Sequence, residues 1–375
     1  MNSELNTQGP TEKQMKSVEK AIEYFKNGKM VIIVDDEGRE NEGDIALPAQ
    51  DCKPEDINFM ATIARGLICT PLDGSIIDKL DLEPMVTQNT ESMGTAFTVS
   101  VDASNDIESG ISAKDRANTV EKLSNPKSEK TDFVKPGHIF PLRYQKGGVL
   151  VRAGHTEGSV DISKLANKNP SGVICEIMSD NGKMAKGKEL IEFANIHKLK
   201  IGRIDDLIAY RLKVEKLVKL KKTDSIKIQN QKYKIKVFEN TLDGSENFAL
   251  IKGKIIPGKK IRVRVISSNL VQNYLMGKKF PDLFNKTIKY FKNFNNCVLV
   301  FIKDTNLKSV TQTLSVFKSN KNYKKSDQMI RNYGIGAQII KSLNITKMIL
   351  VTRSPKKVVS LEGFGIKIIK QEIIK

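Results

Sequence analysis

Apolar and polar positions follow two different periods along the first 211 residues. Between residues 12 and 28 the apolar positions recur at helical spacing, and Gly28 suits a C-terminal cap. Residues 54–65 and 187–197 have the same helical pattern. Short apolar, β-branched runs predict strands at 30–34, 66–69, 95–101, 147–152 and 173–178. Mixed strands and helices of this kind predict an α+β or α/β domain covering residues 1–211.

A lysine-rich amphipathic stretch at residues 212–222 separates this region from a second patterned region, and we expect it to be a linker. Strand patterns follow at 226–238, 248–256, 261–267 and 349–352, and helical patterns at 282–294 and 336–343. These patterns predict a second α/β domain over residues 223–375.

The charge distribution supports this division. The chain has a net charge of +19, yet residues 1–211 contain 27 Lys and Arg against 33 Asp and Glu. Residues 212–375 contain 35 against 10. Such a basic half could attract nucleic acid or phosphorylated ligands electrostatically. Compositional drift is the alternative that we favour, because this half is rich in Lys, Asn and Ile without an arginine-rich stripe, and we expect no nucleic-acid partner.

The sequence gives no sign of membrane insertion or of a disulfide framework. No apolar run reaches the roughly 18 residues that a spanning helix needs, and residues 1–16 lack the apolar core of a signal peptide. The four cysteines are scattered without paired spacing, which argues against disulfides and against a structural zinc site. We therefore expect a protein of the reducing cytoplasm.

The segment Asp35–Asp44 carries six carboxylates and one arginine, and it follows the apolar run at residues 30–34. Carboxylates crowded at the end of a buried strand repel one another unless a cation is present. A hard divalent metal ion suits such oxygen ligands. The alternative is a solvated acidic loop.

Three histidines and one glutamate are further candidates for chemistry. His138 and His155 lie in glycine-containing turns, where catalytic side chains are often displayed, whereas His197 suits a helix end. Glu176 interrupts an apolar strand, and burial would raise its pKa toward the range of a general acid or base. The alternative for Glu176 is an exposed position on an edge strand.

Residues 109–119 combine serines, a glycine, an arginine and a threonine before a helical segment. Such a stretch can form a phosphate cradle at a helix N-terminus, and an ordinary helix cap is the equal alternative.

Together these segments resemble 3,4-dihydroxy-2-butanone 4-phosphate synthase, an enzyme of the riboflavin pathway. The resemblance covers essentially all of residues 12–211. The matching segments are, in order, 35–44, 64–69, 95–102, 109–119, 136–143, 152–157 and 175–177.

The resemblance implies a magnesium or manganese site formed by Glu40 and His155. It implies that His138 and Glu176 are essential for catalysis. It also implies that the substrate D-ribulose 5-phosphate contacts Arg39, Glu40, Asp44, Arg152, Ala153, Gly154, His155, Thr156 and Glu176.

The implied reaction removes C4 of the sugar phosphate as formate and leaves a four-carbon phosphate. A metal ion can stabilise enediolate charge, and carboxylates with a histidine can move protons beside the carbonyl. The resemblance further implies a homodimer with sites near its interface. Gly158 departs from the family, which usually has alanine there, and we expect little effect.

The second half resembles GTP cyclohydrolase II but departs from it at the metal site. The matching segments are 331–339, 354–357 and 361–365, whereas Asn269, Phe280 and Asp282 align with the three zinc-binding cysteines of that family. An amide, a benzyl group and one carboxylate cannot form a thiolate zinc site. The catalytic aspartate of that family aligns with Met329, although Arg331 is retained, and the phosphate-binding loop is replaced near residues 303–306.

We therefore expect residues 223–375 to keep the fold without zinc and without cyclohydrolase activity. Residual GTP binding remains an alternative role for this half. For the whole chain, the alternative is a regulatory or scaffolding protein of the riboflavin pathway.

Overall fold

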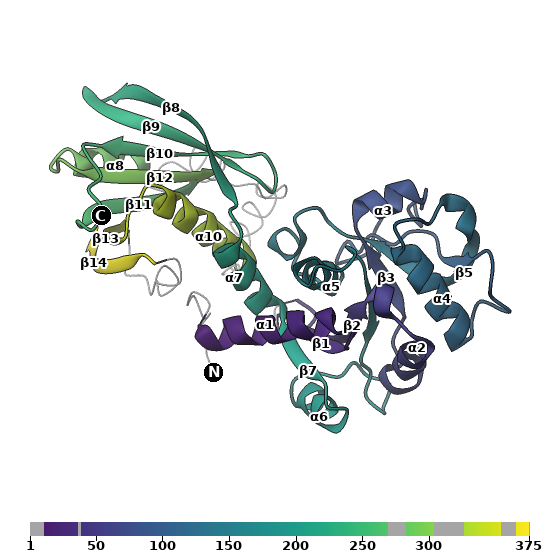
Figure 1. Ribbon diagram of the computed structural model, residues 1–375. Helices are drawn as coiled ribbons and strands as arrows, with labels where there is room; N and C mark the ends of the chain where they lie inside the picture. Colours follow the sequence, from purple (N-terminus) through teal and green to yellow (C-terminus); the bar gives the residue numbers. More distant parts are fainter. Residues whose placement is uncertain (1–10, 37–38, 269–282, 304–325, 354–364, 375) are drawn as a thin grey trace. The chain divides into compact units, whose positions relative to one another are not determined.

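The computed structural model describes residues 11–36, 39–268, 283–303, 326–353 and 365–374, and Figure 1 labels their helices and strands. The chain divides into two compact units. Glu12–Tyr210 form the first unit, and the second unit contains the chain from Arg211 onward. Each unit contains a seven-stranded mixed sheet with helices, which confirms the predicted fold class.

The first sheet has the strand order β4-β5-β3-β6-β2-β1-β7. Strands β2 and β6 pair antiparallel at its centre, and β1 pairs parallel with β7. Because the two central strands are flanked on both sides, they are apolar along most of their length. The strands are β1 (Val31–Val34), β2 (Gly43–Pro48), β3 (Cys69–Leu72), β4 (Val101–Ala103), β5 (Phe133–Arg143), β6 (Gly172–Glu176) and β7 (Lys200–Arg203).

Helices cover both faces of this sheet. Helix α5 (His155–Leu165) packs on one face, where Gly158 lies beside Ile33 of β1, and α1 (Glu12–Lys26) packs against α5. On the other face, Ile32 and Val34 of β1 share a buried core with helices α2 (Pro54–Phe59), α4 (Ala113–Ser124) and α6 (Lys188–Ile196). The unit also contains α3 (Gly74–Lys79), and α7 (Ile204–Val214) follows β7 and ends beyond the unit boundary.

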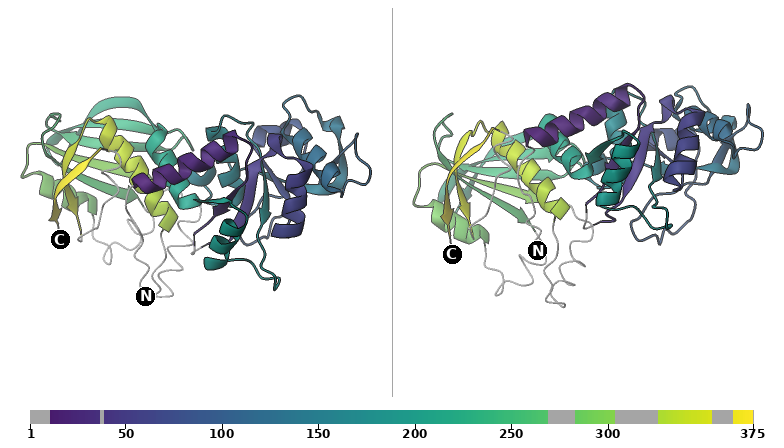
Figure 2. Two further views of the ribbon diagram at one scale, coloured as in Figure 1. Left: turned by 60° about the horizontal axis from the view of Figure 1, so that its bottom comes forward. Right: turned by 90° about the horizontal axis from the view of Figure 1, so that it is seen from below.

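The second sheet has the order β14-β13-β11-β12-β10-β9-β8. Helix α8 (Leu283–Phe291) contributes Ile288 and Phe291 to the core on one face, together with Ile266 of β11. Helix α10 (Ser326–Ser342) lies along the other face, where Gly336 approaches Val265 (Figure 2). The strands are β8 (Val218–Ile228), β9 (Gln231–Asn240), β10 (Glu246–Lys252), β11 (Ile261–Ser268), β12 (Cys297–Lys303), β13 (Lys347–Thr352) and β14 (Lys367–Ile373).

The predicted helices of the first unit are confirmed, but three of its predicted strands are wrong or displaced. The strand predicted at 147–152 is a short 3₁₀ helix, Gly148–Leu150, because Gly147 and Gly148 both have positive φ. The run at 66–69 becomes a strand only from Cys69. The alternation at 95–101 forms isolated bridges, and the strand β4 begins at Val101.

The predicted linker at 212–222 lies in α7 and in β8, with only Glu215–Leu217 between these two elements. Its amphipathic pattern has a structural reason, because Leu212, Leu217 and Val218 are buried. The run predicted at 226–238 is a hairpin of β8 and β9, in which Gln229 and Asn230 both have positive φ and form the turn. In the described residues, no helix has the length and apolar character that a membrane span requires.

Candidate active site

Asp35 organises the acidic loop that follows β1. Its side chain is buried, and its carboxylate accepts hydrogen bonds from the backbone N–H groups of Glu40 (3.1 Å) and Glu42 (2.9 Å). Arg39 donates to the same carboxylate at 2.8 Å and also pairs with Glu40. Because the donors of its own loop occupy the oxygens of Asp35, this residue shapes the loop and presents Glu40. In the sequence, only its position in the acidic run indicated a role for Asp35.

His155 reaches this loop from the first residue of α5. Asp35, Glu40 and His155 each offer one ligand atom, and these atoms lie within 4.8 Å of one another. The His155 side chain is buried, and its Nε2 has no hydrogen-bond partner in the part of the chain that the structure describes. Burial lowers the pKa of His155 to about 4, so its imidazole is neutral at pH 7, which is the form that binds metal ions. Glu40 and His155, with the carboxylate of Asp35 beside them, therefore fit a divalent cation.

Asp44 and Glu176 face each other across the central strands of the sheet. They are register partners of β2 and β6, so their side chains lie on the same face. Burial, and then the charge of Glu176, holds the pKa of Asp44 well above its usual range. Burial also raises the pKa of Glu176, although hydrogen bonds to its carboxylate oppose that effect. The His155 Nδ1 lies 3.7 Å from Asp44, which connects this carboxylate pair to the metal-type cluster.

Two arginines converge on Gly154, the residue before α5. A Cβ atom at Gly154 would lie 2.6 Å from Arg152 Nη1 and 3.2 Å from Arg39 Nη2. Arg152 is held by the buried carboxylate of Glu157 (2.7 Å) and by Thr95 (2.9 Å). Guanidinium groups beside the N-terminus of an 11-residue helix make a candidate site for an anion. Glu157 already pairs with Arg152, and Asp35 and Glu40 pair with Arg39. Of the predicted contacts, Thr156 lies buried in the first turn of this helix, and Ala153 precedes Gly154.

His138 has a different place from the one that the sequence predicted. It lies inside strand β5 and not in a turn, and its side chain is about two-fifths exposed, at 42%. Asp102 of β4 holds its Nδ1 at 2.7 Å and also accepts its backbone N–H at 2.8 Å. Glycines enclose this pair, since a Cβ at Gly110 would lie 2.3 Å from the Asp102 carboxylate. In the described part of the chain, no hydrogen bond or ion pair links His138 to Glu40, His155 or Glu176, and β3, β6 and β2 lie beyond β5 in the sheet.

The stretch 109–119 forms a helix cap. Ser112 is the N-cap of α4, and its hydroxyl accepts the N–H of Asp115 at 3.1 Å. The Asp115 carboxylate in turn accepts the N–H groups of Ser109 (3.2 Å) and Gly110 (3.0 Å). Because a carboxylate of the chain itself already occupies these donors, the structure favours the capping interpretation over a phosphate cradle. His197 likewise caps the C-terminus of α6, with its ring 4.5 Å from that of Phe193.

Among the described residues of the second unit, Arg264 is a buried cation without a carboxylate partner. Arg264 of β11 is buried, its Nε has no hydrogen-bond partner, and its only hydrogen bond in the described residues goes to the Val351 carbonyl at 3.3 Å. Burial, and then the charge of Arg353, lowers the pKa of Arg264 to about 10. The predicted substitutions of the zinc ligands at Asn269, Phe280 and Asp282 lie outside the described residues, as do most of residues 303–306 and the segment 354–364.

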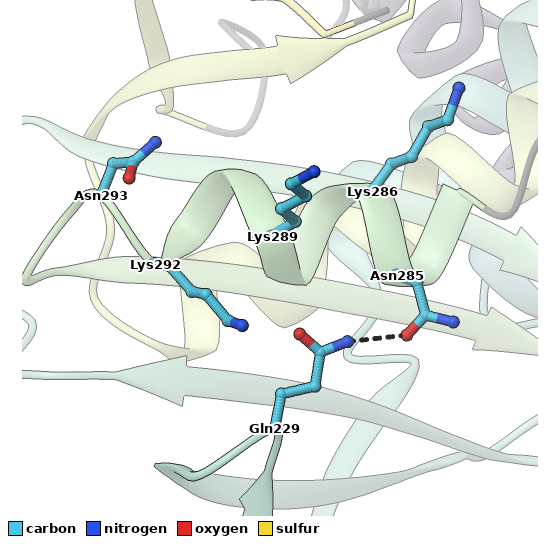
Figure 3. Close-up of a pocket in the computed structure, with 6 residues that line it drawn as sticks. All are labelled: Gln229, Asn285, Lys286, Lys289, Lys292 and Asn293. Carbon is cyan, nitrogen blue, oxygen red and sulfur yellow. Dashed lines mark hydrogen bonds between the residues drawn. The ribbon is translucent and has the colours of Figure 1, made fainter.

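Figure 3 shows a cavity in the second unit that contains none of the predicted site residues. It has a volume of about 470 Å³ and lies between α8 and the turn of the β8–β9 hairpin, where Gln229 donates to Asn285 at 3.0 Å. Its lining side chains are exposed: Gln229, Asn285, Lys286, Lys289, Lys292 and Asn293.

The first unit thus combines a metal-type cluster, an anion site and carboxylates with raised pKa values. These are the groups of a metal-assisted lyase acting on a phosphorylated, oxygen-rich substrate. Comparison with known protein families is consistent with this class. The family 3,4-dihydroxy-2-butanone 4-phosphate synthase matches residues 19–210, and GTP cyclohydrolase II matches residues 220–373.

Relatives extend the match over nearly the whole chain. The riboflavin biosynthesis protein RibBA of Aquifex aeolicus is 41% identical over 96% of this chain and 92% of its own length. A solved structure, RibBX, a two-domain 3,4-dihydroxy-2-butanone 4-phosphate synthase from A. baumannii, has a TM-score of 0.80 and 36% identity, and the match covers 96% of this chain and 99% of that one. A synthase solved in complex with two magnesium ions is 41% identical over 52% of this chain and 97% of its own, with a TM-score of 0.51.

The chain belongs to the 3,4-dihydroxy-2-butanone 4-phosphate synthase family, with a domain of the GTP cyclohydrolase II family fused behind the synthase domain. It is a lyase of riboflavin biosynthesis.

Proposed function

We propose that the first unit converts D-ribulose 5-phosphate to L-3,4-dihydroxy-2-butanone 4-phosphate and formate, with Mg²⁺ or Mn²⁺ held by Glu40 and His155. The observation that carries this proposal is the buried Nε2 of His155 beside Glu40, which has no hydrogen-bond partner among the residues that the structure describes. When bound, the metal ion supplies Lewis-acid polarisation of the sugar oxygens. The magnesium-bound relative supports this choice of cation.

The anion site explains how the substrate is oriented. Arg39, Arg152 and the N-terminus of α5 bind the phosphate end, because they converge on Gly154. With the phosphate fixed, the reacting carbons lie toward the cluster of Glu40, Asp44 and His155. Fixing the substrate in this way removes much of the entropic part of the barrier.

Glu176 and His138 are the proton-transfer groups of the proposal. Burial raises the pKa of Glu176, and this favours proton exchange near neutral pH. Asp102 binds His138 Nδ1, so that Nε2 of His138 is the nitrogen that exchanges protons.

The position of His138 supports a homodimer. His138 is partly exposed and, within the described residues, has no hydrogen bond or ion pair to the cluster of its own chain, so we propose that it serves the site of a second copy. Mixing His138→Ala with Glu40→Gln protein tests this idea, because subunits that exchange would form some dimers with one complete site. Recovery of up to about a quarter of the wild-type activity is expected. Absence of recovery after demonstrated subunit exchange would argue for sites built within one chain.

The direct test of the activity is formate release from D-ribulose 5-phosphate with and without Mg²⁺. Release that depends on the metal and stops with EDTA is the expected outcome. A purified, folded protein that releases no formate under either condition would favour the regulatory or scaffolding alternative.

We further propose that the second unit lacks cyclohydrolase activity and binds no zinc. The aligned substitutions at Asn269, Phe280 and Asp282 support this, as does the two-domain relative whose name gives only the synthase activity. Stoichiometric zinc in the purified protein, together with formate released from GTP, would contradict it. We also propose that the enzyme is cytoplasmic.

One observation favours residual nucleotide binding as a second role of this unit. A buried guanidinium without an acidic partner is expensive unless an anion compensates it, and Arg264 has no such partner among the described residues. Titration calorimetry with GTP should show binding that Arg264→Ala weakens. Heat of binding equal in both proteins would remove Arg264 from this role.

A further inference from the structure

The chain changes its helix type directly before strand β3. After α2 the backbone widens into a π-helix, Met60–Ala64, which ends where Arg65 adopts a φ of 70°. The Arg65 N–H donates to the Met60 carbonyl, five residues back, at 2.8 Å. Short π-helices are rare and often accompany functional sites, and a positive φ is unfavourable for an arginine.

This strained turn lies against the end of β6. Met178 donates its N–H to the Ala64 carbonyl at 2.9 Å, and Arg65 forms an antiparallel bridge with Ile177. A Cβ atom at Gly66 would lie 2.4 Å from the Glu176 carbonyl oxygen and 2.7 Å from its carboxylate Oε2. No other residue fits at position 66 unless Glu176 moves.

The turn also directs a hydrogen bond at the Glu176 side chain. The Leu67 N–H donates to Glu176 Oε2 at 2.8 Å. The ion pair of Arg65 with Asp180 is exposed, so it contributes little to holding the turn. What compensates the strain at Arg65 is therefore the backbone packing against Glu176, Ile177 and Met178.

We propose that Arg65 and Gly66 are positioning residues, whose turn aims the Leu67 N–H at Glu176 and fixes one oxygen of that carboxylate for proton transfer by the other. This inference rests on the proposed role of Glu176. Because the donor is a backbone N–H, it holds the carboxylate without the loss of side-chain entropy that a side-chain donor would require.

Gly66→Ala tests the close approach, with Gly202→Ala as the matched control. A Cβ at Gly202 of β7 would lie 3.7 Å from Ala21, an ordinary contact. Gly66→Ala is expected to lower kcat by about 10²-fold, because small displacements of catalytic groups cost about that much. The KM for D-ribulose 5-phosphate and the rise of Tm with Mg²⁺ should change little, and Gly202→Ala should retain its kcat.

A double-mutant cycle separates positioning from general damage. If Gly66 acts through Glu176, then adding Gly66→Ala to Glu176→Gln should cause no further loss of kcat. Losses that multiply in the double variant would overturn the inference. If Glu176→Gln alone keeps full activity, it is the proposed role of Glu176 that fails, and the inference fails with it.

Arg65 provides an independent test if Gly66→Ala does not fold. Glycine adopts positive φ without strain, so Arg65→Gly should keep kcat within about twofold. Arg65→Val should lower kcat by at least about tenfold, because a β-branched residue disfavours this backbone conformation. Equal kcat values for the two variants, in folded protein, would show that the left-handed turn does not position Glu176.

Discussion

Clusters of polar side chains differ between the two units of the chain. In the second unit, Arg262, Tyr290 and Glu372 neutralise one another, with Arg262 Nε 2.9 Å from Glu372 and Tyr290 donating to the same carboxylate at 2.5 Å. In the first unit, the carboxyl groups of Asp44 and Glu176 lie on the same face of neighbouring strands, and His155 Nε2 has no hydrogen-bond partner among the described residues. A satisfied cluster stabilises a fold, whereas an unbalanced one needs a ligand. In the second unit, Arg264 is also buried, its Nε has no hydrogen-bond partner among the described residues, and this is why a ligand for it is proposed.

The largest expected effect is loss of the proposed metal ligand. Glu40→Gln removes one charged ligand oxygen and should lower kcat/KM for D-ribulose 5-phosphate by about 10³-fold or more, because metal polarisation is worth several kcal/mol. Formate release at saturating Mg²⁺ measures it, and circular dichroism checks the fold. His155→Ala should behave alike. Full turnover in either variant would contradict the assignment of a metal-dependent site to the first unit.

The Asp102–His138 pair should show the next largest effect. Asp102→Asn keeps the shape but no longer holds the histidine in one tautomer, and we expect kcat to fall by about 10²-fold. Asp56→Asn is the control. The Asp56 carboxylate accepts the Lys53 N–H at 2.9 Å, and the proposed reaction gives this residue no role. A pH–rate profile that is unchanged in Asp102→Asn would contradict the assignment.

The pH dependence of stability follows from His155. Its folded pKa of about 4 lies below the unfolded value of 6.5, so the folded state resists protonation. Stability should therefore be fully present above about pH 6.5 and fall as the pH decreases toward 4, by at most about 3 kcal/mol. Asp44 acts in the opposite direction, because its pKa is raised.

Urea unfolding of the metal-free protein between pH 7 and pH 4 measures this effect. The difference between wild type and His155→Ala isolates the histidine from the carboxylates. Identical pH slopes in the two proteins would mean that His155 is not held neutral.

A smaller effect, on stability, is expected when the cluster of Arg262, Tyr290 and Glu372 in the second unit is disrupted. Glu372→Gln leaves Arg262 without its carboxylate and should lower the free energy of unfolding by about 1–2 kcal/mol. The synthase activity should be unchanged, because the residue lies outside the first unit. A large loss of kcat with intact folding would show that the second unit contributes to catalysis.

The smallest effect is expected at the cavity in Figure 3. Lys289→Ala changes an exposed side chain and should alter stability by no more than about 0.5 kcal/mol. Synthase turnover should match the wild type. A clear loss of turnover would mean that this cavity contributes to the synthase reaction, although its exposed lining residues do not indicate such a role.

The local sequence predicted helices and strands correctly where apolar runs and charged residues follow one another along the chain. The apolar run before Asp35 predicted strand β1, and the helical pattern from residue 12 predicted α1. The fold brings together Glu40 and His155, the metal ligands that the family resemblance implies, and their role stays a prediction. The strand predicted at 147–152 failed because two glycines with positive φ override the apolar pattern.

The sequence by itself thus determined the kinds of side chains available for chemistry and most of the elements that carry them. Only the tertiary structure decided that Asp102 holds His138, that Gly66 contacts Glu176 and that Arg39 meets Arg152 at Gly154. The physical reason is that periodicity records which side of an element is buried. Contacts between residues far apart in the chain depend on how whole strands pair, and no local pattern records that pairing.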